Sequence, residues 1–425
     1  MSEVDRTPDA LAGAGAGAVA EAEAGAAARD LREAAWLDGK RAASWLWFGA
    51  VGVVVMAIGS LYSSYVNPEL FGKIFKPPDY MAFWTASVVM MEQGAAATYD
   101  WAATHAVMLE TLGVETIGGI LPWNYPPHAL PFISWLGLGH PAWMMVVWVG
   151  LQVSIFLLIC WRILPHRLTL LGAFLTAPML ITLVTGQAGL YWAVLLALAI
   201  EYRRSHPVLS GLALGFATMK PHLFVPLPLA FLAERTVMAL VWASVTLLAL
   251  VALTTLVGGF AVWEAWIGKL EATTVTHTSD TADYRLTASV FSYLRSWLVP
   301  IPVAGAVHAG LALPCVAIMV VVWASPRMPE DLKAAVLCFA LFAAGPRTMI
   351  YEMALLYVGI LYQLRYALAH GFFPYEKIML VALGAFNVMS MTKVPGVFPA
   401  FPYILLLALF FGRCLPILRS RAAIS

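Results

Sequence analysis

The stretch PAWMMVVWVGLQVSIFLLICW, residues 141–161, carries no charged side chain. It is long enough to cross a bilayer, which takes about 20 predominantly apolar residues as a helix. Similar apolar segments recur along the chain at about 44–64, 168–184, 189–202, 207–219, 222–234, 237–257, 302–323, 333–344, 349–363, 378–391 and 397–412. The sequence therefore predicts an all-α polytopic membrane protein, a helical bundle of about 12 transmembrane helices.

The composition agrees with this class. Of the 425 residues, 61% are hydrophobic and 12% are charged, whereas a soluble domain has about 25% charged residues. No basic stripe is present, which argues against nucleic-acid binding. The four cysteines lie in or beside apolar segments without a C-x-x-C pair, so we expect small buried core residues: Cys160, Cys315, Cys338 and Cys414.

The chain divides into a tail and a membrane domain. Residues 1–43 are rich in Ala and Gly and predict a disordered cytoplasmic tail, whose end can be helical and lead into the first span. Residues 44–425 predict the transmembrane domain, with a long first extracytoplasmic loop at 65–126 that contains interfacial helices, and a second outer loop at 258–300. Several apolar segments have only about 12–15 residues, which suits broken helices that line a cavity.

Lys and Arg residues set the orientation, because they favour the cytoplasmic side. With both termini cytoplasmic and residues 127–138 treated as a half-inserted helix, 17 of the 25 Lys and Arg residues lie inside. If 127–138 crosses instead, every later assignment reverses and the rule is violated. The first topology gathers the unexplained polar stretches on the outer face: Asp79, NYPPH (124–128), TGQAG (185–189), MKPH (219–222), the loop 264–295, GPRTMIYE (345–352) and Lys393. An outward-facing site follows.

Asp79 in KPPDYMAFW has two possible roles. An Asp after two prolines is a frequent helix N-cap. A carboxylate between apolar walls at the membrane surface can also act as a general base. The helix that follows, 80–92, has Tyr80, Phe83 and Trp84, which suit the bilayer interface and a lateral entrance for a lipid.

Lys220 is the strongest cationic candidate, because a basic residue at membrane depth is costly and often functional. Pro221 breaks the helix beside it. The Lys220 ammonium can hold a lipid phosphate, together with the adjacent His222, or extend to the interface as an ordinary snorkelling lysine. Arg347 can grip a phosphate with two hydrogen bonds.

Three further residues are expected to line the site. Gln187 follows Gly186 in a tight turn and offers donors and an acceptor to a sugar, although a simple turn explains the pattern equally well. Tyr125, beside Pro126 and Pro127, shapes the loop next to Asp79. Glu352 either pairs with Arg347 or faces the cavity. The stretch HTSD (277–280) does not have the spacing of a metal site, and we expect no metal or cofactor.

Signatures of nucleotide-dependent chemistry and of a serine hydrolase elbow are absent from the sequence. Energy for a reaction must therefore arrive with the substrate, or the protein is a passive or gradient-driven device.

Four stretches in this order resemble glycosyltransferase family 87: DYMAFWTASVVMMEQGAAATYD (79–100), NYPPHALPFISWL (124–136), TGQAGLYWAVLLALA (185–199) and GLALGFATMKPHLFVPLPLAF (211–231). The resemblance covers most of residues 75–235 and continues loosely to about 365. It implies a GT-C-type membrane enzyme, similar to mannosyltransferases, that moves a sugar from a polyprenyl-phosphate donor to a hydroxyl of a glycolipid or glycan with inversion. Mannose or arabinofuranose is the expected sugar.

The resemblance also assigns roles to residues. It implies an active site on the extracytoplasmic side of a bacterial plasma membrane, with Asp79 as the catalytic base. Lys220 and Gln187 belong to the donor site. Apart from the resemblance, we expect Tyr80 and Tyr125 to line the cavity. Some relatives have a His where this chain has Glu352, so no role beyond lining is carried over to Glu352.

Two alternatives remain. A transporter or flippase of lipid-linked sugars commonly has two similar halves, and no convincing internal repeat is present. An O-antigen-type ligase or polymerase usually has its large outer loop late in the chain, whereas here the longest loop comes early.

Overall fold

The structure is a computed structural model that describes residues 30–66, 79–117, 122–278, 287–389 and 401–420. In these residues the regular structure is helical, and the one pairing of extended backbone is an isolated antiparallel bridge between Thr287 and Met349. The prediction of an all-α protein is confirmed.

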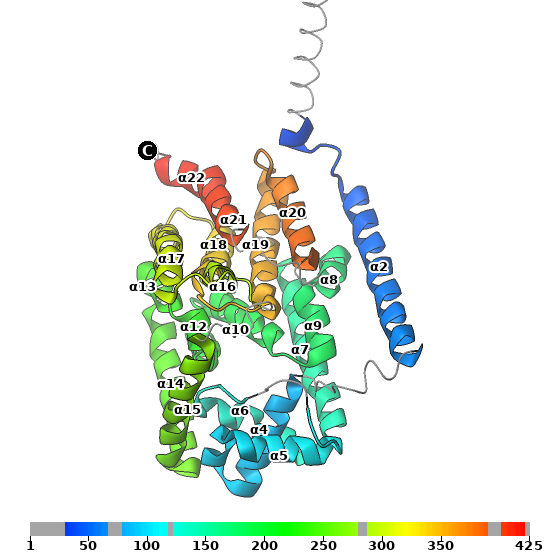
Figure 1. Cartoon of the computed structure of the whole chain (residues 1–425). Helices are drawn as coiled ribbons and strands as arrows, with labels where there is room; N and C mark the ends of the chain where they lie inside the picture. Colours follow the sequence, from blue (N-terminus) through cyan, green and yellow to red (C-terminus); the bar gives the residue numbers. More distant parts are fainter. Residues whose placement is uncertain (1–29, 67–78, 118–121, 279–286, 390–400, 421–425) are drawn as a thin grey trace, which may run out of the picture.

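Helix α2 (Gly39–Val66) contains the predicted first span and runs along the side of the bundle (Figure 1). The segment before it is attached to the bundle, because Tyr375 N donates to Arg32 O at 2.8 Å and Lys377 Nζ donates to Ala34 O at 3.1 Å. Ala34 is also buried. Residues 30–43 therefore contain helical turns that lead into α2 and contact the bundle, as a helical end of the tail would, while residues 1–29 lie outside the described residues.

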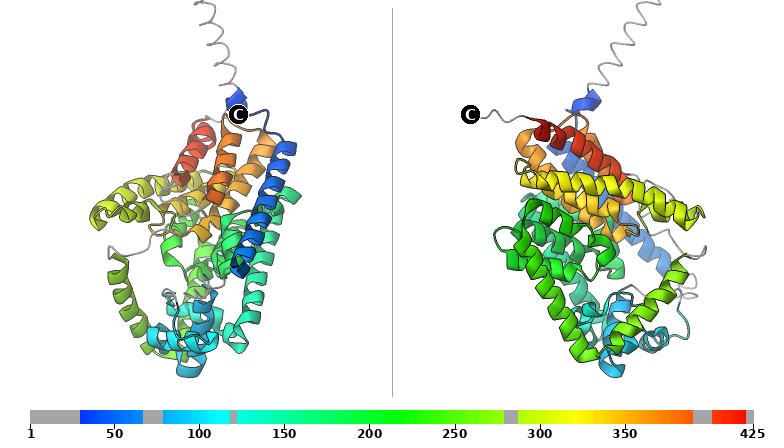
Figure 2. Two further views of the ribbon diagram at one scale, coloured as in Figure 1. Left: turned by 45° about the vertical axis from the view of Figure 1, so that its right-hand side comes forward. Right: turned by 90° about the vertical axis from the view of Figure 1, so that its left-hand side faces the viewer.

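The elements that follow form the end of the molecule opposite the two ends of the described chain (Figures 1 and 2). The N-cap of α5 is Asp100, whose side chain accepts a hydrogen bond from Ala102 N at 2.9 Å, as a preferred cap residue does. The elements of this end are α4 (Tyr80–Gln93), η1 (Ala95–Tyr99), α5 (Trp101–Leu112), η2 (Pro127–Ala129), α6 (Leu130–Ile133) and η3 (Ser134–Leu138).

Helix α4 is buried along a continuous run that includes Phe83 and Trp84. Its neighbour η3 approaches closely because Gly137 lacks a side chain, and Ser87 Oγ accepts from Gly137 N at 2.9 Å. Trp84 Nε1 donates to Gly139 O at 3.0 Å. The aromatic face expected at the bilayer interface is thus directed into protein, because η3 and its flanking turns cover it.

Residues 127–138 are divided into three short pieces, of which the α-helical one, α6, has 4 residues. Pro127 and Pro131 interrupt the helix here, since proline cannot donate a backbone hydrogen bond. The segment contains no helix of spanning length, and its half-insertion into the membrane stays a prediction.

The central part of the chain forms the next group of helices. The expected segments 141–161 and 237–257 are long helices with nearly the predicted bounds. Segments 207–219 and 222–234 are shorter helices separated at Lys220. The elements are α7 (Pro141–Ile163), α8 (Arg167–Phe174), α9 (Ala177–Thr185), α10 (Gly189–Tyr202), α11 (Pro207–Ala217), α12 (Pro221–Phe224), α13 (Leu227–Glu234), α14 (Val237–Gly258) and α15 (Ala261–Thr278).

The last group packs around α18 (Glu330–Ala344), in which every residue from Leu332 to Ala343 is buried. A helix that is apolar on all sides belongs in a core, and α18 lies between α17 and α19. The other elements are α16 (Val290–Ser296), α17 (Ile301–Ala324), η4 (Ile350–Met353), α19 (Ala354–His370), α20 (Glu376–Met389), α21 (Phe401–Leu409), the π-helical η6 (Phe410–Cys414) and α22 (Leu415–Arg419).

In the described residues four helices are long and apolar enough to cross a membrane. They are Pro141–Ile163, Val237–Gly258, Ile301–Ala324 and Pro402–Arg419. The pair α8 and α9, bent by 57°, makes a fifth if it counts as one broken span. The expected number of about 12 crossings is not confirmed, because many of the predicted segments form helices too short to cross alone.

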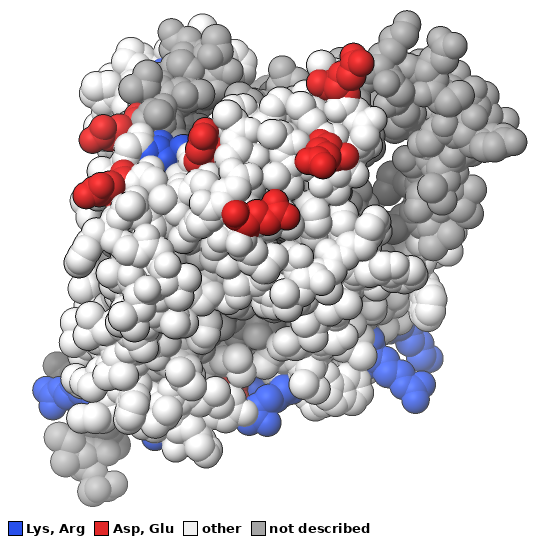
Figure 3. Space-filling view, turned by 90° about the horizontal axis from the view of Figure 1, so that it is seen from below, with Lys and Arg blue, Asp and Glu red and all other residues white. Residues whose placement is uncertain are grey.

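Charge is distributed unevenly between the two ends. Viewed from the end that carries α4 and α5, the surface shows carboxylates over one part of the face and Lys and Arg side chains along one edge (Figure 3). Exposed acidic residues of α4, α5, α15 and the adjoining turns are Glu92, Asp100, Glu110, Glu115, Glu264 and Glu271. Toward the opposite end, α10, α18 and α19 carry or adjoin Arg203, Arg204, Lys333 and Arg365.

Candidate functional site

Asp79 immediately precedes α4, and its Oδ2 accepts a hydrogen bond of 2.8 Å from Gln187 Nε2. Its side chain makes no capping hydrogen bond to α4, and its backbone is already helical (φ −58°, ψ −22°), whereas an N-cap is typically extended. The capping role predicted for Asp79 is therefore wrong. The carboxylate turns toward the α9–α10 turn instead.

Gln187 is fixed by a turn that requires glycine. Gly186 ends α9 in the left-handed region (φ +69°), and a Cβ there would lie 2.6 Å from Tyr80 Cβ. Only glycine adopts both this conformation and this approach without strain. Trp148 Nε1 donates to Gly186 O at 2.8 Å, and Thr182 Oγ1 donates to Gln187 O at 3.2 Å. The turn therefore presents Gln187 to Asp79 in a defined position.

Lys220 lies at the break between α11 and α12, where Pro221 begins α12. Its ammonium is buried and forms an ion pair with Glu352 Oε1. It lies 4.7 Å from the centre of the Tyr351 ring and 5.8 Å from that of Trp192. A desolvated ammonium over two aromatic faces gains cation–π stabilisation. Lys220 is therefore directed into the protein and does not extend to the surface.

Glu352 is fully buried, and its second oxygen, Oε2, accepts a hydrogen bond of 2.9 Å from Met349 N. Glu352 was expected either to pair with Arg347 or to face the cavity. Its ion-pair partner in the structure is Lys220, which the sequence did not indicate. His222 lies within electrostatic range of Lys220, Glu352 and Arg347. The structure thus brings Arg347 and His222 to the same neighbourhood as Lys220.

Two contacts join the Asp79–Gln187 pair to the Lys220–Glu352 pair. A Cβ on Gly189, two residues after Gln187, would lie 2.2 Å from Tyr351 O, so the start of α10 packs directly on η4. Tyr125 stacks on Trp192 at 6.0 Å. Burial raises the pKa of the Tyr125 phenol; the Lys220 charge opposes this shift, and the charges of Glu352 and Asp79 add to it. All three charges therefore lie near Tyr125. We call Asp79, Tyr125, Gln187, Lys220, Tyr351 and Glu352 the central polar cluster.

The model of glycosyltransferase family 87 matches residues 123–346, more than half of the chain. The chain belongs to glycosyltransferase family 87. No match is found to a curated protein or to a solved structure. With its apolar helices, the protein is an integral membrane glycosyltransferase.

The family 87 region contains part of the central polar cluster, namely Tyr125, Gln187 and Lys220. Asp79 lies before it, while Tyr351 and Glu352 lie just after it. Two members of the neighbourhood, Tyr351 and Trp192, were missed by sequence reasoning. In a chain with 16 Trp and 15 Tyr residues, no pattern separates a ring beneath an ammonium from a core ring.

The remaining predicted site residues are placed as follows. Tyr80 is buried, and its hydroxyl has no hydrogen-bond partner in the part of the chain that the structure describes. Asp280 of the HTSD stretch and Lys393 lie outside the described residues. Among the described residues, no group of three or more His, Cys, Asp or Glu side chains is arranged as metal ligands.

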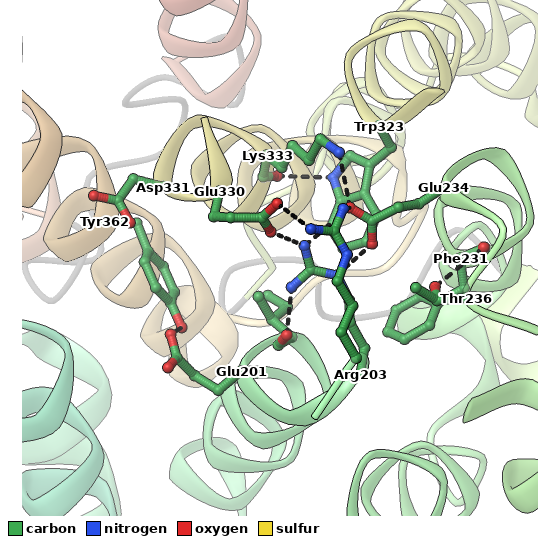
Figure 4. Close-up of polar contacts among 12 residues, drawn as sticks. Glu201, Arg203, Phe231, Glu234, Thr236, Trp323, Glu330, Asp331, Lys333 and Tyr362 are labelled. Carbon is green, nitrogen blue, oxygen red and sulfur yellow. Dashed lines mark hydrogen bonds and ion pairs between the residues drawn. The ribbon is translucent and has the colours of Figure 1, made fainter. Parts of the chain in front are cut away.

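A second charged cluster joins α10, α13 and α18 (Figure 4). Arg203 pairs with Glu234 and Glu330, and Lys333 Nζ donates to Glu234 Oε1 at 2.8 Å. Arg204 bonds the same two carboxylates, at 2.7 Å and 2.8 Å. We call these five residues the Arg203 cluster.

The ion pairs of the Arg203 cluster connect three helices to one another. Each cation in it faces a carboxylate, and Arg203 also stacks over the Trp323 ring at 4.8 Å. A surface pocket beside it is lined by Glu201, Arg204, Glu330 and Arg365 among others, and Arg365 is in turn paired with Asp331. Because the charges satisfy one another, this cluster serves packing, and the central polar cluster is the candidate active site of this family 87 protein.

Proposed function

We propose that the central polar cluster transfers a sugar, mannose or arabinofuranose, from a polyprenyl-phosphate donor to a hydroxyl of a glycolipid or glycan. The observation that carries this proposal is the convergence of a carboxylate, Asp79, and a buried ammonium, Lys220, from distant segments of a glycosyltransferase. Inverting transfer needs a base for the acceptor hydroxyl and positive charge for the departing phosphate.

The reaction balances with these groups alone. Asp79 takes the proton of the acceptor hydroxyl while the hydroxyl oxygen bonds to the anomeric carbon of the sugar. The bond from that carbon to the phosphate oxygen breaks, and its electron pair leaves with polyprenyl phosphate. Lys220, with Arg347 nearby, stabilises the charge that develops on the leaving phosphate. The energy comes from the phosphate ester of the donor.

Gln187 and Tyr125 take positioning roles in this scheme. Gln187 orients the Asp79 carboxylate through the 2.8 Å hydrogen bond. Because an amide is neutral, this partner leaves Asp79 its negative charge and its ability to accept a proton. Tyr125 lies near both Asp79 and Lys220, where a sugar between the base and the phosphate would contact it.

The orientation belongs to the same proposal. The Lys and Arg residues on and beside α10, α18 and α19, toward the end opposite α4 and α5, fit a protein whose α4 end is extracytoplasmic, since cytoplasmic loops are enriched in Lys and Arg. The two chain termini then lie in the cytoplasm and the active site faces outward.

The direct test uses purified protein in lipid nanodiscs with a panel of polyprenyl-phosphate sugars and, separately, nucleotide sugars. We expect a new glycolipid by mass spectrometry with a polyprenyl-phosphate sugar and release of polyprenyl phosphate in equal amount. Products from nucleotide sugars alone would contradict the proposed donor class. In sealed proteoliposomes, movement of an unchanged donor across the bilayer would instead identify a transporter.

A further inference from the structure

Lys220 has an anionic partner within the protein itself. Its ammonium pairs with Glu352, and the two side chains are 6% and 0% exposed. A lysine that awaits a phosphate would bind it most tightly without a competing carboxylate. The presence of Glu352 therefore weakens phosphate binding, and the structure invites the question of which phosphate it weakens most.

Glu352 is not a side chain that can easily move away. One oxygen accepts from Met349 N at 2.9 Å, while the Glu352 backbone N–H donates to Met349 O at 3.0 Å. This reciprocal arrangement closes the start of η4, as a capping box does. The other oxygen is left toward Lys220. The carboxylate therefore stays beside Lys220 when a phosphate arrives.

The surroundings make this charge effective. The Tyr351 and Trp192 rings lie at 4.7 and 5.8 Å from Lys220 Nζ, and Trp192 is itself buried. In such a buried environment of low dielectric constant, charges interact more strongly than they do in water. A fixed carboxylate then repels a bound phosphate in proportion to the charge of that phosphate.

Substrate and product of the proposed reaction differ in that charge. The donor is a phosphodiester with one negative charge, whereas the released carrier is a phosphomonoester with close to two, because its second pKa is about 6. A cationic site with no carboxylate would hold the spent carrier more tightly than the donor. That preference would leave the enzyme inhibited by its own product.

We propose that Glu352 is a counter-charge that disfavours the spent phosphate carrier relative to the donor and so promotes product release. This inference rests on the proposed function, because it takes the donor and the product from that reaction. It adds a role for a residue that neither binds the sugar nor takes the proton.

The test measures binding, so it requires no turnover. Three probes that share the same lipid chain are compared: farnesyl phosphate, its methyl diester and farnesol. The titrations are run at about pH 8, where the monoester, farnesyl phosphate, is dianionic. Each is titrated into wild-type protein and Glu352→Gln in nanodiscs. Gln retains an oxygen for Met349 N–H. We expect the Kd of the diester to fall about tenfold and that of farnesyl phosphate about a hundredfold, since repulsion scales with charge. Farnesol binding should not change.

Glu376→Gln is the matched control. Glu376 is fully buried, accepts from the backbone N of Phe373 at 2.9 Å and pairs with Arg413. It repeats the arrangement of Glu352 on a different helix, α20, so its loss reports the general effect of neutralising a buried, paired carboxylate. We expect both phosphate affinities to stay at the wild-type value. If Glu352→Gln does not fold, Glu352→Asp, which withdraws the charge from Lys220, should shift the two affinities in the same direction by less.

Equal changes for monoester and diester, or no change for either, would overturn the inference. The proposed function is judged separately by sugar transfer. Transfer with an unchanged monoester-to-diester ratio removes the role of Glu352 alone. A shifted ratio in a protein that transfers no sugar from any polyprenyl phosphate removes the proposed reaction and leaves the counter-charge in place.

Discussion

Gln187 donates a 2.8 Å hydrogen bond to Asp79 although 108 residues separate them. The two other charged side chains of the central polar cluster, Lys220 and Glu352, neutralise each other. Asp79 instead has a neutral partner, so the protein orients this carboxylate without cancelling its charge. A base must be both placed and charged, and this contact satisfies both conditions.

Asp79→Asn should lower kcat about 10²- to 10⁴-fold, the usual contribution of a general base. Asparagine has nearly the same shape, so folding and donor binding should change little. The measurement is sugar transfer at saturating donor, with the unfolding temperature recorded in parallel.

Glu92→Gln is the control for that change. Glu92 is an exposed carboxylate at the other end of the same helix, α4. Its neutralisation should leave kcat at the wild-type value. Near-normal turnover of Asp79→Asn would remove the base from the mechanism, and an equal loss in Glu92→Gln would show that the effect is one of overall charge.

The sequence predicted the ends of the long helices well, because local features of the sequence determine where these helices begin and end. Segments 141–161 and 302–323 match α7 (Pro141–Ile163) and α17 (Ile301–Ala324), since apolar length and an early proline define such helices. The segment 349–363 was wrong at its start, where η4 replaces the α-helix and α19 begins at Ala354. Hydropathy cannot show that the Glu352 carboxylate accepts a hydrogen bond from the backbone N–H of Met349 there.

The candidate site was predictable by residue type but not by pairing. Asp79, Gln187 and Lys220 stand out because polar groups in apolar segments are costly. The Lys220 contact to Tyr351 joins residues 131 positions apart, and helix packing alone determines it. The aromatic residues of α4 were predicted to lie at the bilayer interface but are buried in the protein. The sequence does not separate the two cases, because burial against η3 and location at a bilayer interface favour the same residue types.

Gly186→Ala should reduce transfer strongly and stability measurably. The left-handed conformation costs a non-glycine residue about 1–2 kcal/mol, and the new Cβ would lie 2.6 Å from Tyr80 Cβ. The turn must then shift, and Gln187 moves away from Asp79. We expect a lower kcat together with a lower unfolding temperature.

Gly113→Ala separates the two causes. Gly113 has nearly the same backbone (φ +63°) but open space where its Cβ would lie. It should lose about the same conformational energy and keep full transfer activity. If both variants retain wild-type kcat, the position of the Gln187 turn does not matter for the reaction.

Glu234→Gln should destabilise the fold without a specific effect on chemistry. Glu234 bonds Arg203, Arg204 and Lys333, so its neutralisation leaves buried cations short of a counter-charge. Breaking a buried ion pair typically costs about 3–5 kcal/mol. Thermal unfolding in detergent should show the loss, while the folded protein keeps its kcat. Glu271→Gln, an exposed carboxylate on α15, should leave the unfolding temperature unchanged; a specific loss of kcat in Glu234→Gln would instead assign the Arg203 cluster to the reaction.

The last prediction separates the structural and functional roles of Lys220. Lys220→Met leaves Glu352 buried without its cation, which should cost about 3–5 kcal/mol of stability and also abolish binding of the donor phosphodiester. Adding Glu352→Gln removes the uncompensated charge, so most of the lost stability should return. Donor binding should not return, because no ammonium remains to attract the phosphate. Unfolding temperatures and phosphodiester titrations of the two single variants and the double variant form a double-mutant cycle. If the double variant recovers donor binding together with stability, Lys220 only supports the fold and the phosphate is held elsewhere.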